Sequence, residues 1–427
     1  MGLAILLGVF AACVVAGVPV AFALGISAVA AFYAEGLPLI IAFQRIVSGI
    51  NIFSLMAIPF FIFAGELMFH GGIAVRLVRF ASAAVGAARG GLGIVNVFSS
   101  MLFGGISGSA VADISALGSI LIPVMKEKGY DDDYAVNVTV TSSIAGIMIP
   151  PSHNMILFAV AAGGGISISK LFLAGVVPGV VMCLCLAVAA YVIAIRRGYQ
   201  SEAFPGLKIL ALHFITALPG LFTAVIIVGG VLSGVFTVTE SGAFGTLYAF
   251  LVTIIVYRAL TWENFKLAVI NSVRTTSMVM ILVASAAAFA YMLTFFQVPS
   301  RMIDLMTGIS ENPIAILLMM NAMLLVLGMI MDMAALILIC TPIFLPVAAS
   351  IGVDPLQFGM ILMMNLGLGL CTPPVGSCLF VGCAVGNVPI ERAVRTIWPF
   401  YAAIFIALML TTFVPAISLT LPNLLAN

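Results

Sequence analysis

Charged side chains are scarce in this sequence of 427 residues. Aspartate, glutamate, lysine and arginine together make up 7% of it, whereas hydrophobic residues make up 63%. Because soluble domains carry about 25% charged residues, this composition excludes a soluble globular protein. A helix that crosses a bilayer needs about 20 mostly apolar residues, and the chain contains a long series of such stretches. We therefore predict an all-α polytopic protein embedded in a lipid bilayer. The net charge of +1 predicts no nucleic-acid partner.

Motifs for soft metals and for catalysis are also missing from the sequence. The seven cysteines lie in apolar segments, and none forms the CxxC pair of a zinc or redox site. The three histidines, His70, His153 and His213, are far apart in the sequence, and no HExxH pattern occurs. We therefore do not expect an enzyme embedded in the membrane.

Nine stretches are long and apolar enough to be predicted as full spans. They lie near 3–33, 50–70, 133–163, 171–195, 216–235, 239–257, 274–297, 356–386 and 397–421. Segment 73–88 differs, because Arg76 and Arg79 lie on one side of a helix and apolar residues lie on the other. Segment 300–310 has a similar pattern. Both segments are therefore predicted to be amphipathic helices at the membrane interface.

Two further apolar regions, 91–125 and 314–350, are interrupted in the middle. The centre of the first region reads Gly-Gly-Ile-Ser-Gly-Ser over 104–109, and glycine and serine favour turns. Each arm is too short to cross a hydrocarbon core of about 30 Å. Exposed backbone at membrane depth is tolerated only where it is buried in protein or lines a cavity. We therefore predict two re-entrant helical hairpins whose tips lie inside the protein.

The chain contains an internal repeat. Residues 123–163 align on residues 346–386 without a gap, so that the pair Pro150-Pro151 falls on Pro373-Pro374. Because proline removes a main-chain N–H and clashes with the preceding turn, each pair is predicted to break a transmembrane helix. The repeated unit is a span, an amphipathic helix, a hairpin and a broken span. We predict one domain, 1–427, with repeat one near 17–180 and repeat two near 239–405.

The lysines and arginines predict the orientation of the repeats. If the two repeats are inverted, only Arg45, Lys170 and Arg301 of the 16 basic residues lie outside, and the other 13 lie on the cytoplasmic side. Cytoplasmic loops of membrane proteins are enriched in lysine and arginine. We therefore predict inverted repeats and a cytoplasmic N-terminus. An odd number of full spans then places the C-terminus outside.

The four predicted breaks form a candidate ion site in each repeat. A broken helix leaves main-chain carbonyl groups at one helix end, which bind cations, and N–H groups at the other, which attract anions. Inverted repeats with broken helices are typical of secondary transporters. Hydroxyl and carbonyl oxygens suit Na⁺. We predict one site made by Ser107, Ser109, Ile147, Pro150 and Ser152, and a second made by Gly328, Gly367, Thr372 and Val375.

Four side chains near the breaks are predicted to face the substrate: Asp113, His153, Asn154 and Asp332. Ionisable residues at membrane depth are costly and usually functional. Each aspartate has an alternative role as the N-cap of the second hairpin arm. His153 and Asn154 are replaced by glycine and serine in repeat two. This asymmetry indicates substrate discrimination, and the alternative is a packed, hydrogen-bonded histidine.

Five motifs resemble one known family. They are GGISGSAVAD at 104–113, IPPS at 149–152, TPPVG at 372–376, TVTES at 237–241 and IPFFIFAGELM at 58–68. They resemble the large membrane subunit of TRAP transporters, the DctM-like family, and the resemblance covers essentially the whole chain. TVTES departs from the family, which more often has proline at the second position.

This resemblance implies Na⁺-coupled uptake of an organic acid anion by an elevator mechanism. Sialic acid, other sugar acids and C4-dicarboxylates are all open as substrates. The resemblance also implies sodium near the two hairpin tips and a location in the bacterial inner membrane, with the C-terminus periplasmic. The implied partners are a small four-helix membrane subunit and a periplasmic substrate-binding protein. The alternative function is a stand-alone, ion-coupled carrier of dicarboxylate or another anion with a related hairpin fold.

Overall fold

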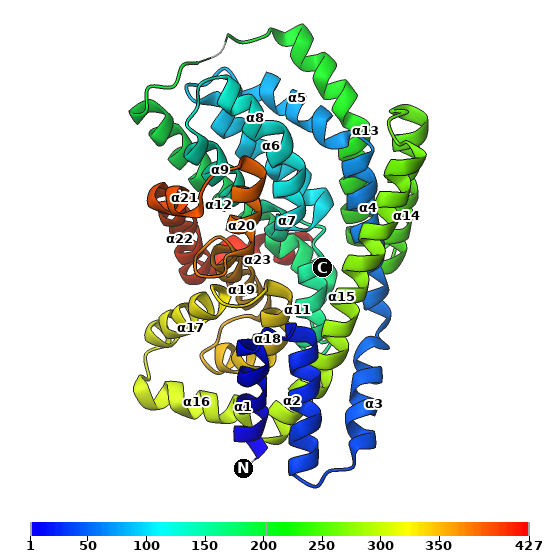
Figure 1. Cartoon of the computed structure of the whole chain (residues 1–427), viewed down its shortest axis with the longest axis vertical. Coiled ribbons are helices and arrows are strands. Elements are labelled where there is room, and N and C mark those ends of the chain that lie inside the picture. Colours follow the sequence, from blue (N-terminus) through cyan, green and yellow to red (C-terminus); the bar gives the residue numbers. More distant parts are fainter. Residues whose placement is uncertain (1, 202, 426–427) are drawn as a thin grey trace.

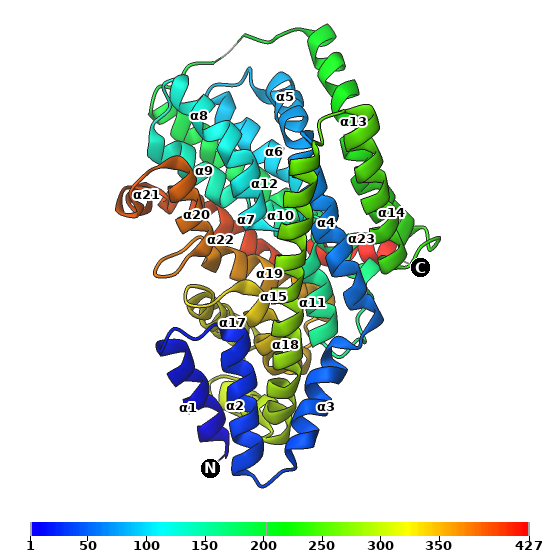
Figure 2. The same ribbon diagram turned by 45° about the vertical axis from the view of Figure 1, so that its right-hand side comes forward.

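The computed structural model describes residues 2–201 and 203–425. Within these residues nearly all regular structure is helical, and the one β feature is an isolated bridge between Arg89 and Ser201. Figures 1 and 2 show an elongated body in which helices from the two halves of the chain lie side by side. The predicted all-α membrane class is confirmed. Within the described residues, six helices are long and apolar enough to cross a bilayer.

The first predicted span, 3–33, is wrong. It is two helices, α1 (Gly2–Val15) and α2 (Val20–Ala34), which pack against each other. Both figures show them side by side at the lower end of the molecule, where the N-terminus also lies. The chain turns because Gly17 has a φ of +78° and because Pro19 cannot donate a main-chain hydrogen bond. The predicted count of nine full spans is therefore wrong. The prediction that the two termini lie on opposite sides rested on this odd number, and it no longer follows.

Long helices form a frame along one side of the molecule. Helix α15 runs without a break and packs against α2, α3 and α4, while α14 packs against α4 and α13. Their bounds are α3 (Leu39–Ile50), α4 (Ala57–His70), α13 (Leu207–Leu232), α14 (Val238–Leu251) and α15 (Trp262–Phe295). A short 3₁₀ helix, η1 (Phe53–Met56), precedes α4, and a π-helical turn, η3 (Val252–Val256), extends α14.

The two predicted amphipathic helices are present. They are α5 (Ile73–Val85) and α16 (Val298–Ile309), and Figure 1 shows them near opposite ends of the molecule. In α5 the apolar side chains of Ile73 and Leu77 are buried, whereas Arg79 is exposed. Each amphipathic helix joins the frame to one of the interrupted apolar regions.

Both interrupted regions turn back on themselves, as predicted. In the first, α6 (Gly91–Ser107) is followed by α7 (Ala110–Asp113), the π-helical turn η2 (Ile114–Gly118) and α8 (Ser119–Glu127). In the second, α17 (Pro313–Gly328) is followed by α18 (Met333–Ser350). The first turn is shorter than the predicted 104–109, because α6 continues through Ser107 and ends at Gly108, which has a φ of +63°.

Both Pro-Pro pairs interrupt helices, as predicted. The first separates α9 (Asp132–Ser142) and α10 (Ala145–Met148) from α11 (His153–Ala161), with a bend of 53°, and the second separates α19 (Pro355–Leu370) from α20 (Ser377–Gly386). Both pairs contain a cis peptide bond. The remaining helices are α12 (Ile168–Arg196), α21 (Ile390–Thr396), α22 (Trp398–Phe413) and α23 (Pro415–Leu425).

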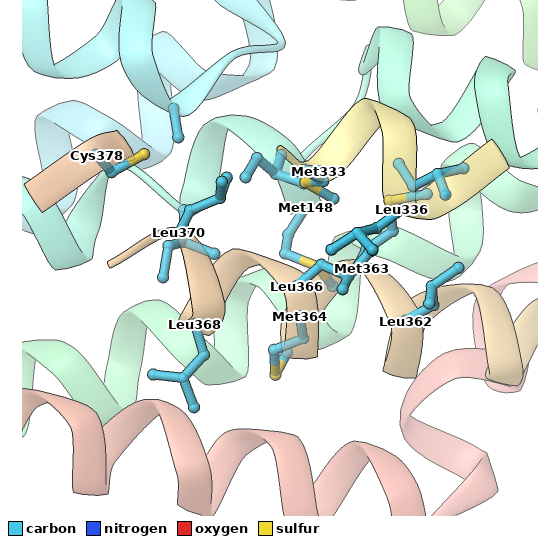
Figure 3. Close-up of a cluster of buried hydrophobic side chains, with 14 of the residues drawn as sticks. Met148, Met333, Leu336, Leu362, Met363, Met364, Leu366, Leu368, Leu370 and Cys378 are labelled. Carbon is cyan, nitrogen blue, oxygen red and sulfur yellow. The ribbon is translucent and has the colours of Figure 1, made fainter. Parts of the chain in front are cut away.

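An apolar core lies directly beside these breaks. Figure 3 shows side chains of α10, α18 and α19 meeting around Met148, Met333 and Leu366. All three are at most 3% exposed. Met148 precedes the first Pro-Pro pair and Met333 begins the helix after the second hairpin tip. The core therefore joins an interrupted element of one half of the chain to interrupted elements of the other.

An ion-pair cluster fixes the start of the first broken helix. The guanidinium group of Arg197, just beyond α12, lies 2.8 Å from a carboxylate oxygen of Asp131 and 2.9 Å from one of Asp133. The hydrogen bonds that Arg197 donates to Asp133 are the main reason why the pKa of Arg197 is raised, so this guanidinium stays charged at every physiological pH. The cluster ties the N-terminus of α9 to the C-terminus of α12.

Candidate ion and substrate site

The tip of the first hairpin lies against the first Pro-Pro loop. A Cβ atom added to Gly104 would lie 2.7 Å from the Cα atom of Gly146, and one added to Gly108 would lie 3.1 Å from the carbonyl oxygen of Pro151. Real Cβ atoms do not approach main-chain atoms as closely as the first of these distances. Glycine at position 104 therefore allows the hairpin and the broken helix to touch through their backbones.

One of the two predicted hydroxyl groups of the first tip contacts a buried carboxylate. The Ser107 hydroxyl donates a hydrogen bond to Oδ1 of Asp113, which is 1% exposed. Oδ2 of Asp113 has no hydrogen-bond partner among the described residues. It faces Gly146, where an added Cβ would lie 2.8 Å away. A buried carboxylate oxygen without a partner is costly, and a bound cation would remove that cost.

The two aspartates that follow the hairpin tips, Asp113 and Asp332, have different roles in the structure. Ser109, not Asp113, is the N-cap of α7, since its hydroxyl accepts a hydrogen bond from the main-chain N–H of Ala112 at 3.4 Å. Asp332 does cap α18, because its carboxylate accepts one from the N–H of Ala334 at 3.0 Å. The N-cap alternative is therefore wrong for Asp113 and confirmed for Asp332.

The second hairpin tip lies against the second Pro-Pro loop in the same way. The N–H of Val375 donates a hydrogen bond to the carbonyl oxygen of Met329 at 3.0 Å. A Cβ atom added to Gly369 would lie 2.6 Å from the carbonyl carbon of Gly328. Gly367, which the sequence predicts for this site, instead faces Ile144, the residue before α10. A Cβ atom added to Gly367 would lie 2.8 Å from the side chain of Ile144. Gly369, rather than Gly367, makes the close approach to the tip.

The predicted polar residues of the loops lie at the ends of the broken helices. Ser152 precedes α11, and its buried hydroxyl has no partner among the described residues. Asn154, in the first turn of α11, is 5% exposed, and His153 is half-buried. Thr372 donates its hydroxyl to the carbonyl oxygen of Leu368 at 2.7 Å. An oxygen lone pair of each hydroxyl remains available for a cation.

Main-chain and hydroxyl oxygens dominate both places where a tip meets a loop. Ile147 and Pro150 are buried on the loop side of the first contact. Within residues 2–201 and 203–425, no three histidine, cysteine, aspartate or glutamate side chains come together as metal ligands. A cation at either place would therefore be held mainly by oxygens of the kind that bind Na⁺.

Comparison with known proteins assigns this arrangement to a family. Residues 7–417 match the model of the DctM component of tripartite ATP-independent periplasmic transporters. The chain belongs to the DctM family. This DctM chain is 38% identical over 417 residues to the sialic acid TRAP transporter large permease protein SiaM of Vibrio cholerae, covering 96% of each chain. It is 34% identical over 438 residues to the C4-dicarboxylate TRAP transporter large permease protein DctM of Rhodobacter capsulatus, covering all of both.

A solved transporter structure shares the fold of this DctM chain. The YdaH transporter of Alcanivorax borkumensis superimposes with a TM-score of 0.62 and covers 88% of each chain. Its sequence identity is 12%, so the likeness concerns the fold alone. The family and the fold together confirm a membrane transporter subunit, as the motifs of the sequence predict.

Two buried polar contacts in this DctM chain were not predicted from the sequence. Each joins the first arm of a hairpin to the adjacent broken helix. In the first half, the Ser142 hydroxyl donates to the side-chain oxygen of Asn96 at 3.1 Å. In the second, the amide of Asn365 donates to the main-chain and side-chain oxygens of Asn321, both at 2.9 Å. Their signal in the sequence is an asparagine or serine at matching places of the repeat within apolar helices.

Replacing Asn365 with leucine is expected to destabilise this DctM chain by about 1–3 kcal/mol, because the side-chain oxygen of Asn321 is left buried without a donor. Ser142→Ala is the matched change in the first half. It should cost a similar amount, because the side-chain oxygen of Asn96 is then also left buried without its donor, although the amide group of Asn96 keeps its 2.6 Å hydrogen bond to Thr139. Thermal unfolding in detergent measures both. A wild-type unfolding midpoint for Asn365→Leu would contradict a stabilising contact between Asn365 and Asn321, whereas Asn365→Ser, which restores a donor, should recover part of the loss.

Proposed function

We propose that this chain couples the entry of Na⁺ to the uptake of an organic acid anion, as the large carrier subunit of a tripartite transporter. Its family membership makes it a TRAP large permease. The observation that carries the coupling proposal is the contact of each hairpin tip with its own Pro-Pro loop. That contact brings together the ends of four helical segments, whose carbonyl and N–H groups lack partners within the helices. Such discontinuous helices bind ions and anionic substrates in secondary transporters.

The first proposed Na⁺ site lies between Asp113 and the loop. The unpartnered Oδ2 of Asp113 and the unpartnered hydroxyl of Ser152 are buried oxygen ligands. The hydrogen bond from Ser107 holds the Asp113 carboxylate in place. Ser109, Ile147 and Pro150 provide hydroxyl or main-chain oxygens nearby. A carboxylate at this place favours a cation over an anion, so we assign Asp113 to Na⁺ rather than to the substrate.

The second proposed Na⁺ site lies between the second tip and its loop. Gly328 and Gly367 supply main-chain carbonyl groups at the ends of α17 and α19, and Thr372 supplies a hydroxyl. Val375, which bonds to Met329, holds the loop against the tip. The carboxylate near this site belongs to Asp332, and it accepts the N-cap hydrogen bond of α18, whereas an oxygen of Asp113 in the first site has no partner among the described residues. The two sites are therefore proposed to differ in charge.

Substrate discrimination is proposed to involve His153 and Asn154. Both lie in the first turn of α11, whose N–H groups carry positive partial charge and attract an anion. Asp332 stays a predicted substrate contact. The named substrates of similar relatives differ, being sialic acid for one and C4-dicarboxylates for another. Overall sequence identity to these relatives therefore does not indicate which substrate this chain carries. We expect the side chains at the start of α11 to determine its selectivity.

The element order favours inverted repeats that move as an elevator. Each half of the chain has an amphipathic helix, a hairpin and a broken helix in the same order, and α5 and α16 lie near opposite ends of the molecule (Figure 1). The basic residues favour a cytoplasmic α5 end under the positive-inside rule. Because the N-terminus lies at the opposite end of the molecule (Figure 1), this proposed orientation puts the N-terminus on the outer side, and not in the cytoplasm as the sequence predicts. We propose that the hairpins and broken helices move together across the bacterial inner membrane, relative to the frame. A small four-helix subunit and a periplasmic binding protein are the proposed partners.

Uptake into proteoliposomes tests the coupling. The chain is reconstituted with its small subunit, and the binding protein is added with labelled sialic acid or succinate. We expect uptake of the accepted anion only with an inward Na⁺ gradient, and uptake at the level of protein-free vesicles when choline replaces Na⁺. Full uptake driven by a proton gradient alone would overturn Na⁺ coupling. Full uptake by the chain without either partner would favour the stand-alone carrier instead.

A further inference from the structure

A small cavity lies between the amphipathic helix α5 and the frame helix α13. Its volume is about 210 Å³, and Ala203 and Pro205, which precede α13, form part of its lining. Arg79 and Ser82 line it from α5, and His213 and Ile209 line it from α13. Figure 1 shows α5 and the first turns of α13 at the same end of the molecule. The cavity therefore lies at the level of a membrane interface, where an amphipathic helix is expected.

Positive charge in this cavity has no counter-charge in the described part of the chain. Arg79 is exposed and forms no salt bridge with any described residue. Lys208, at the start of α13, is also exposed. A second cavity is lined by Arg89 together with Gly198 and Ser201, which follow α12. Each of these basic groups can donate hydrogen bonds to an anion.

The apolar surroundings of the cavity match a lipid. Ile209 and Leu212 of α13 are 43% and 58% exposed, and Ile215, almost one turn further along, is 63% exposed. This face of α13 continues away from the cavity toward the membrane interior, so acyl chains would lie along it. A soluble anion would gain nothing from these side chains, whereas a phospholipid buries them.

We propose that this cavity binds the phosphate headgroup of an anionic phospholipid. Arg79 provides the charge, and Ser82 and His213 donate hydrogen bonds to phosphate oxygens. Basic pockets between transmembrane helices on the cytoplasmic side bind anionic headgroups in other membrane proteins. The bound lipid would join α5, which leads into the first hairpin, to α13, which connects the two halves of the chain. It would therefore hold one end of the hairpin arm against the frame.

Native mass spectrometry of the full chain, in the complex in which it is purified, tests this proposal. Phosphatidylglycerol is the probe, and phosphatidylethanolamine is the zwitterionic reference. We expect Arg79→Gln to reduce retained phosphatidylglycerol about fivefold, since one basic residue at an anionic surface contributes about 1 kcal/mol. Arg301→Gln, in the amphipathic helix at the opposite end, is the matched control and should retain wild-type amounts. An unchanged thermal unfolding midpoint shows that Arg79→Gln remains folded.

Three results would overturn the proposal. Equal retention of phosphatidylethanolamine would show that the cavity does not select anionic lipid. Displacement of phosphatidylglycerol by inorganic phosphate at equal concentration would assign the cavity to a soluble anion. A fall in retention after Glu202→Gln would also contradict it, because removing the one acidic residue of 197–206 should leave retention unchanged or increase it. None of these measurements requires transport, so the outcome is independent of Na⁺ coupling.

Discussion

Replacing Asp113 with asparagine is expected to reduce Na⁺-driven uptake by at least about tenfold, the lower end of the loss when a side chain beside a bound metal is removed. The change keeps the size of the side chain and its hydrogen bond with Ser107, but it removes the negative charge. The concentration of Na⁺ that gives half-maximal uptake should therefore rise. Uptake in proteoliposomes over a series of Na⁺ concentrations measures both quantities.

Stability separates this prediction from simple misfolding. Burial of an unpaired charge is unfavourable, so Asp113→Asn should unfold at the wild-type temperature or above it when Na⁺ is absent. Added Na⁺ should stabilise the wild type, because a ligand that binds only the folded state raises its stability, and this stabilisation should be smaller in the variant. Asp354→Asn, which changes an exposed N-cap of α19, is the matched control and should behave as wild type in both assays. Wild-type Na⁺ dependence of Asp113→Asn would remove this carboxylate from the ion site.

The breaks in the helices could be predicted from the sequence because their chemistry is local. Glycine and serine at a hairpin tip, or two consecutive prolines, prevent a helix from continuing whatever surrounds them. The same local rule accounts for residues 16–19, where Gly17 and Pro19 divide the first apolar stretch into α1 and α2. Apolar composition alone does not show whether a long stretch crosses the bilayer once or turns back.

The roles of individual polar residues depended on details that the sequence does not contain. Asp113 and Asp332 both follow a hairpin tip, but only Asp332 caps the helix after its tip, whereas Ser109 caps α7 and Asp113 is the last residue of α7. A shift of a few residues in the turn thus changes a carboxylate from a cap into a buried group. The tie between Asn321 and Asn365 joins residues 44 positions apart, and it depends on side-chain directions that only packing determines.

The sequence also does not predict how closely each tip approaches its loop, although it contains the glycines that permit the approach. Gly367 and Gly369 are two residues apart in α19 and belong to the same apolar segment. They differ because one faces Ile144 and the other faces the backbone of Gly328. The repeat identified the segment in which a close approach occurs, and the rotation of the helix identified the residue.

Replacing Gly369 with alanine is therefore expected to abolish most Na⁺-driven uptake. The new Cβ atom would lie 2.6 Å from the carbonyl carbon and 2.7 Å from the Cα atom of Gly328, so the tip and α19 must move apart. Added atoms in a packed core cost about 1–3 kcal/mol. Since 1.4 kcal/mol corresponds to a tenfold change, binding at the second site should weaken by about tenfold or more. Uptake against Na⁺ concentration in proteoliposomes measures the loss.

Two other glycines make this prediction specific. Gly229 lies within α13 with no atom within 4 Å of an added Cβ, so Gly229→Ala should keep wild-type uptake and gain up to about 1 kcal/mol from helix propensity. Gly104→Ala, whose Cβ would lie 2.7 Å from the Cα atom of Gly146, should instead lose uptake as Gly369→Ala does. If Gly369→Ala transported with the wild-type Na⁺ dependence, the contact between tip and loop would not form part of the ion site. Loss of uptake in both Gly104→Ala and Gly369→Ala, with wild-type uptake in Gly229→Ala, would show that both contacts between a tip and a loop are needed for transport.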